Sequence, residues 1–149
     1  RLLGEIGEEL VRAEARRELE HLGHIELARA VRRVSLESDQ LGYDVSAPRI
    51  SGARRLLEVK ATTRIATDMR GVHLSRNEAD VGARYPHDWA LVVCQITNPD
   101  AAKGEIVGWC SHPSLDKLLP HDTARGRWEQ AWVEIPSEAF TPGLPRATG

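Results

Sequence analysis

The sequence predicts an α/β fold in which a mixed central sheet is flanked by helices. Three observations predict it. A helical pattern opens the chain, three strand-like segments follow, and a second helical pattern precedes a long apolar run typical of a buried strand. The predicted order is therefore αβββαβ, with further strands toward the C-terminus.

The first predicted element is a helix over residues 3–22 that ends near Gly23, since glycine commonly follows the last turn of a helix. Apolar residues cluster on one face of this helix: Leu3, Ile6, Gly7, Leu10 and Val11. Glu14 falls in the middle of that stripe, and Glu8 lies toward its edge. A carboxylate on an apolar face needs a polar partner, because burying it alone costs free energy.

Three strands are expected next, over residues 30–36, 42–47 and 54–62. The connection between the last two contains proline, serine and glycine, which favour turns, so these strands should pair as a hairpin. In the third strand, Glu58 and Lys60 alternate with apolar residues, so both charges project from one face of the sheet.

A second helix is expected over residues 75–85, where Ser75 and Glu78 have the spacing of a capping box. Residues 89–97 form a near-continuous apolar run, typical of a strand buried on both faces. Residues 104–110 form a further apolar strand.

The chain of 149 residues is long enough to bury a core, and we expect one domain over residues 1–149. The regular patterns run over about residues 3–110, and an irregular extension with one short helix and one strand follows over 111–149. Since the chain begins with Arg1 rather than methionine, we expect it to be one domain of a larger polypeptide.

The composition is that of a globular protein, with 41% hydrophobic and 28% charged residues. No apolar run approaches the length needed to span a bilayer, so no membrane partner is expected. Cys94 and Cys110 lie in strand-like runs, and buried, reduced thiols favour a cytoplasmic location over a disulfide scaffold. The histidines lack zinc spacing and the cysteines form no C-x-x-C pair, which argues against a zinc module.

The net charge of −2 gives no global sign of nucleic-acid binding. The charge is uneven, however, because residues 49–84 hold eight basic and four acidic residues. This local surplus fits a groove that faces phosphates, and it fits a solvated mixed surface equally well.

Asp44, Glu58 and Lys60 are the strongest candidates for catalytic chemistry. If the second and third strands form a hairpin, Asp44 comes beside Glu58 on one face, and Lys60 follows on that face. Paired carboxylates are hard oxygen ligands suited to Mg²⁺, and a neighbouring lysine can hold a water or stabilise a charged phosphate. This arrangement suits metal-assisted phosphodiester hydrolysis. A Glu58–Lys60 salt bridge on an exposed sheet face is the structural alternative.

Four segments in this order carry a resemblance to a known family. They are GEIGEELVRAEARREL at residues 4–19, GYDV at 42–45, LLEVKAT at 56–62 and LSRNE at 74–78. Together they resemble the nuclease-like domain family named after the C-terminal region of the plant protein NO VEIN, which is placed in the PD-(D/E)XK nuclease superfamily. The resemblance covers about residues 4–97. It implies a restriction-endonuclease-like core and Mg²⁺-dependent cleavage of DNA, with Mn²⁺ able to substitute.

Carried over residue by residue, the resemblance implies that the catalytic residues are Asp44, Glu58, Lys60 and Glu8. It implies that the metal ion is held by Asp44, Glu58, Glu8 and the carbonyl of Val59. Lys60 would position the attacking water. For Glu8, an exposed ion pair with Arg12 is the structural alternative.

Four further residues are candidates for supporting roles. Glu14 is a candidate partner for Lys60 or for a metal ligand, or a buried acid bound to backbone amides. Asn77 stands in the first turn of the second helix, where it can contact a phosphate together with the helix amides. Arg55 and Arg64 flank the proposed site and are candidates for DNA contacts, with solubility as the default role of surface arginines.

Two hypotheses for function follow from these observations. The leading one is a metal-dependent DNA endonuclease domain of a restriction or phage-defence protein. Its expected partners are DNA, other domains of the same polypeptide and, for cleavage of both strands, a second copy of the chain. The alternative is a catalytically inactive module that keeps the nuclease fold for DNA docking or protein assembly.

Overall fold

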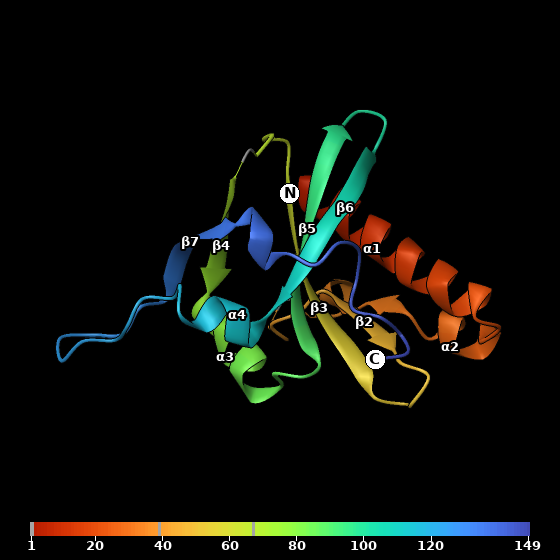
Figure 1. Ribbon diagram of the computed structural model, residues 1–149, viewed down its shortest axis with the longest axis horizontal. Helices are drawn as coiled ribbons and strands as arrows, with labels where there is room; N and C mark the ends of the chain where they lie inside the picture. The colour runs from red at the N-terminus through yellow and green to blue at the C-terminus, as the bar shows by residue number, and fades with distance from the viewer. Residues whose placement is uncertain (1, 39, 67) are drawn as a thin grey trace.

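The computed structural model describes residues 2–38, 40–66 and 68–149. Helix α1 covers one face of a five-stranded sheet, and a two-stranded sheet with α3 lies against the other face (Figure 1). The helices are α1 Leu2–His21, α2 Ile25–Arg29, α3 Arg76–Arg84 and α4 His112–Asp116. The strands are β1 Arg32–Arg33, β2 Val45–Pro48, β3 Arg54–Thr62, β4 Met69–Ser75, β5 Trp89–Asn98, β6 Lys103–Ser111 and β7 Gln130–Pro136. Short 3₁₀ turns cover Val34–Leu36 and Ser137–Ala139.

The five-stranded sheet has the order β1-β2-β3-β5-β6 and is mixed. β2 and β3 pair in antiparallel fashion, β3 and β5 run parallel, and β6 returns antiparallel to β5. The predicted α/β class, the mixed sheet and the hairpin between the second and third strands are thus confirmed. β3 and β5 occupy the middle of the sheet, where both faces are covered, and this explains the apolar run of β5.

Helix α1 packs on the sheet through residues spaced mostly by four: Ile6, Gly7, Val11, Ala15 and Leu19. A Cβ at Gly7 would stand only 3.0 Å from the Cβ of Ala61, so the glycine allows the close approach of helix and β3. Because four residues turn a helix by about 400°, this stripe moves around the helix by about 40° per step. Near Glu14, the residues of α1 that face the sheet therefore lie on a different side of the helix from Glu14.

Glu14 is therefore not the buried acid that was expected. Its carboxylate lies at the surface and binds Arg17 at 2.6 Å. This neighbour holds the pKa of Glu14 below its usual range through a hydrogen bond. The proposed partnership with Lys60 is wrong, since the carboxylate already has a partner on its own helix.

The second sheet was missed in part by the sequence prediction. β4 was not predicted, and it pairs in antiparallel fashion with β7, which lies about sixty residues further along the chain. The first strand is also shorter than predicted, since only β1 and a 3₁₀ turn stand within residues 30–36. Val133 and Ile135 of β7 are fully buried, so the core extends beyond residue 110, where its end was expected.

Candidate active site

Asp44 lies directly before β2, at the point where the hairpin with β3 opens. Its backbone N–H donates to the Leu57 carbonyl, and its Oδ2 accepts a 2.8 Å hydrogen bond from the Val59 N–H. The side chain thereby continues the hydrogen-bond ladder of β2 by one step. Because the N–H and C=O of one strand residue point to the same side, the Val59 carbonyl lies on the edge that faces Asp44.

Asp44 and Glu58 form a pair of neighbouring carboxyl groups. The register pairs Val45 with Leu57. Asp44 and Glu58 therefore stand opposite each other at the next step of the hairpin, as the sequence predicted. Glu58 is almost fully buried, at 4% exposed. The two carboxyl groups are close enough to share a hydrogen bond when one of them holds a proton.

Both members of this pair are easier to protonate than an ordinary carboxyl group. Burial raises the pKa of Asp44 to about 6, against the opposing effect of the Val59 N–H. Burial also raises the pKa of Glu58, and repulsion from Asp44 raises it further. Two acids that repel each other in a partly dry site would be relieved by a bound cation.

Lys60 follows Glu58 on the same face of β3 and contacts two carboxylates. Its Nζ lies 3.3 Å from Glu58 Oε2 and 2.9 Å from Glu78 Oε1. Burial lowers the pKa of Lys60, but the charges of Glu58 and Glu78 outweigh it and the net shift is upward. Lys60 is thus a charged donor at the lip of the acidic pair.

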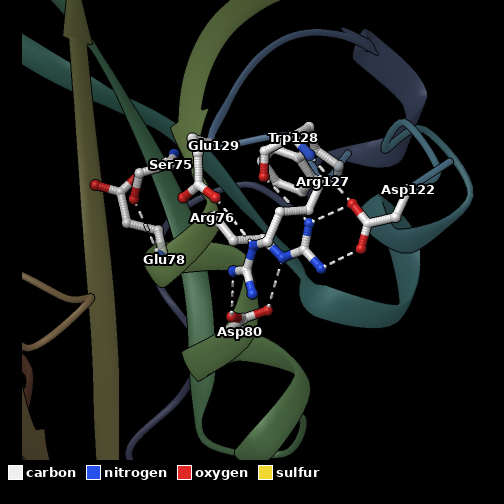
Figure 2. A network of polar contacts seen from close by, with 8 residues as sticks. All are labelled: Ser75, Arg76, Glu78, Asp80, Asp122, Arg127, Trp128 and Glu129. Carbon is white, nitrogen blue, oxygen red and sulfur yellow. Dashed lines mark hydrogen bonds and ion pairs between the residues drawn. The ribbon is translucent and has the colours of Figure 1, made fainter. Parts of the chain in front are cut away.

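Glu78 was assigned only to helix capping by the sequence, and the structure gives it a second contact. The capping box is confirmed, since Ser75 Oγ accepts from the Glu78 N–H and Glu78 Oε1 accepts from the Ser75 N–H (Figure 2). The same Oε1 accepts the hydrogen bond from Lys60. The sequence signal for this second contact was the capping-box glutamate itself, at the start of the next helix after Glu58 and Lys60 along the chain.

Arg76, which follows Ser75 and begins α3, binds the segment that precedes β7. Its guanidinium binds Asp122 through two hydrogen bonds, of 2.8 and 2.6 Å, and contacts Asp80 and the ring of Trp128 (Figure 2). The hydrogen bonds from Arg76 lower the pKa of Asp122 to about 2. This network holds the N-terminus of α3, and with it Glu78, in place.

Glu8 lies near Asp44 but has other partners. Its Oε1 accepts hydrogen bonds from Arg33 and from Ser35 Oγ, the latter at 2.6 Å. Glu8 and Asp44 line one hollow of about 520 Å³ together with these two residues. The alternative pair with Arg12 is not formed, because Arg12 binds Glu9.

In the described part of the chain, no group of three histidine, cysteine, aspartate or glutamate side chains gathers into a metal-ready cluster. The expected three-carboxylate site is therefore not formed, since Arg33 and Ser35 bind Glu8. Asp44, Glu58 and the Val59 carbonyl still fit Mg²⁺, which is commonly held by one or two carboxylates while waters complete the octahedron.

The remaining candidates fall in different places. Arg55 is fully buried and binds Glu18 at 2.7 Å, so its expected contact with DNA does not fit this structure. Successive side chains of a strand point to opposite faces, and the odd-numbered residues of β3, which include Arg55, face α1. Asn77 is exposed and donates to the Gln40 carbonyl, and Arg64 is exposed beside Lys60.

A family model described as "Protein NO VEIN, C-terminal" matches residues 7–106, which is 100 of the 149 residues. The chain belongs to this family. The NO VEIN C-terminal match contains all the carboxylates of the site and Lys60, and it ends before β7. No curated protein and no solved structure matches the chain. Among the described residues, no helix has the length and apolar character needed to cross a membrane.

Proposed function

We propose that this chain is a metal-dependent DNA endonuclease domain that hydrolyses phosphodiester bonds. The observation that carries the proposal is the meeting of Asp44, Glu58 and Lys60 at the open end of the β2–β3 hairpin. The resemblance of the NO VEIN C-terminal family to PD-(D/E)XK nucleases supports it. By the same resemblance, we infer a place within a larger cytoplasmic restriction or phage-defence protein.

Asp44 and Glu58, with the Val59 carbonyl, would hold Mg²⁺, and Mn²⁺ would substitute. When bound, such an ion would supply polarisation of the phosphate, a lowered pKa of a water and neutralisation of the leaving oxygen. Lys60, a charged donor already fixed by Glu78, would orient the water and stabilise charge on the phosphate. Glu8 holds Arg33 and Ser35 beside Asp44, where a guanidinium can contact a neighbouring phosphate.

Cleavage of supercoiled plasmid DNA in Mg²⁺ or Mn²⁺ tests this function. We expect the wild type to nick or linearise the plasmid, and Asp44→Asn and Lys60→Ala to lose that activity. Lys117→Ala, which removes an exposed lysine of the C-terminal segment, is the matched control and should cleave normally. Equal activity of all four proteins would reject the assignment.

A non-catalytic module for DNA docking or assembly is the second candidate, favoured by the engagement of Glu8 with Arg33 and Ser35. It predicts no saturable Mn²⁺ site and a DNA affinity that Asp44→Asn does not change. Calorimetric titration with Mn²⁺ separates the two, because a site abolished by Asp44→Asn counts against this alternative.

A further inference from the structure

A hollow opens next to Lys60, on the side away from Glu8. It has a volume of about 390 Å³ and lies between the end of β3 and the β4–β7 sheet. We call it the Trp132 hollow; the lining residues used below are Lys60, Arg64, Gly71, His73 and Trp132. Since Lys60 belongs to its wall, a ligand seated here would lie directly beside the proposed catalytic residue.

Trp132 presents an aromatic surface in this hollow. It remains 51% exposed, while its neighbours on β7, Ala131 and Val133, point into the core. A Cβ at Gly71 would lie 2.0 Å from a ring carbon of Trp132, so the indole occupies the space that a side chain at position 71 would fill. The His73 ring contacts the indole edge-on, with 4.8 Å between the two ring centroids. The indole is thus held in place before any ligand arrives.

Two cationic side chains line the hollow. They are Arg64 and Lys60, the second of which shares its charge with Glu58 and Glu78, and no carboxylate is among the hollow's described lining residues. A smaller hollow of about 180 Å³ adjoins it, shares Arg64 and Trp132, and adds Arg70 and one carboxylate, that of Glu134. Cations beside an exposed aromatic ring are the combination that binds single-stranded nucleic acid, through phosphates and through base stacking.

We infer that the Trp132 hollow binds one unpaired nucleotide of the DNA substrate, with its base stacked on Trp132 and its phosphate on Arg64. The inference rests on the proposed function and narrows its substrate class. A duplex hides the faces of its bases, so stacking on a side chain requires a single strand, an overhang or an extruded base. The preferred substrate is therefore DNA with an unpaired segment next to the scissile phosphate.

Binding without cleavage tests the subsite independently of catalysis. Fluorescence anisotropy in EDTA compares a labelled single-stranded oligonucleotide with the blunt duplex of the same sequence. We expect Trp132→Ala to weaken single-strand binding by roughly 10- to 100-fold and duplex binding by less than about twofold. Trp132→Phe should retain most of the affinity, since it keeps a stacking face. Arg64→Ala should weaken binding and reduce the salt dependence by about one phosphate contact.

Tyr85→Ala is the matched control, because Tyr85 is similarly exposed, at 43%, and lies at the end of α3. Its single-strand affinity should equal that of the wild type. Wild-type affinity in Trp132→Ala, an equal loss for single strand and duplex, or no single-strand binding by the wild type would each overturn the inference. If thermal melts show that Trp132→Ala does not fold, the single-strand affinities of Trp132→Phe and Arg64→Ala test the inference instead. Binding that depends on Trp132 in a protein that cuts neither plasmid DNA nor DNA with an unpaired segment would uphold the subsite and reject only the nuclease.

Discussion

Lys60 Nζ and Ser75 N–H donate to the same oxygen, Oε1 of Glu78, each at 2.9 Å. One carboxylate therefore closes the capping box of α3 and fixes Lys60 of β3. The position of Lys60 beside Glu58 depends on the start of a helix that follows it by sixteen residues. Helix capping and the proposed catalytic site are thus one structural unit.

Glu78→Gln should separate the two roles of this residue. The amide oxygen can still accept from Ser75, so stability should change little, whereas the charge next to Lys60 is lost. Because the Glu78 carboxylate raises the pKa of Lys60, that pKa should fall, as measured by NMR titration. Plasmid cleavage should drop roughly 10- to 100-fold. Glu129→Gln, which removes an exposed carboxylate bound to Arg127, is the control, and an unchanged Lys60 pKa in Glu78→Gln would contradict the coupling.

Asp44→Asn should stabilise the metal-free domain at high pH. Burial raises the pKa of Asp44 from 3.8 to about 6, so the folded state binds this proton more tightly than the unfolded chain. The stability that this bound proton contributes is thus fully present below about pH 4 and is lost as the pH rises through 6. The ionised carboxyl costs about 3 kcal/mol at pH 8. Urea unfolding in EDTA at pH 8 and pH 4.5 should show an advantage of Asp44→Asn that shrinks at the lower pH; an advantage that grows there would refute the assignment.

Mn²⁺ binding should release protons and weaken in acid. Because the pKa values of Asp44 and Glu58 are both raised, a cation must displace a proton held by the pair. Calorimetry at pH 6 in two buffers of different ionisation enthalpy should give different apparent heats, and the affinity should increase between pH 5.5 and pH 8. Glu105→Gln, which removes an exposed carboxylate of β6, is the control and should titrate like the wild type. Heats that do not depend on the buffer would rule out proton displacement.

Arg55 should matter for stability and not for DNA. Its guanidinium binds Glu18 and the Pro145 carbonyl, and Glu18 also accepts from the Ala147 N–H, so the pair ties the C-terminal tail to α1. Arg55→Ala removes a fully buried guanidinium and leaves the partly buried Glu18 carboxylate with only the Ala147 N–H, and should cost about 3–5 kcal/mol of unfolding free energy. Arg17→Ala, which removes the surface partner of Glu14, should cost less than about 1 kcal/mol. Similar losses in urea unfolding for the two variants would show that the buried pair is no more important than the exposed one.

The elements that the sequence predicted best are those with local signals. The capping box of Ser75 and Glu78 marks the start of α3 within one residue, and the apolar run of β5 needs no partner to be recognised. The juxtaposition of Asp44 and Glu58 also followed from the sequence, because a hairpin brings neighbouring segments together by the shortest route. β4 was missed because its partner is the distant β7, and pairing between remote segments leaves no periodic signal of its own.

The sequence by itself determined the α/β class, the hairpin that joins Asp44 to Glu58, and the family, since each depends on residue types within short segments. Only the tertiary structure decided the partners of the long charged side chains. In the structure, Arg55 pairs with Glu18, Glu8 with Arg33, Glu14 with Arg17 and Lys60 with Glu78. A side chain of this length reaches several neighbours, and which one it binds depends on the faces that packing brings together.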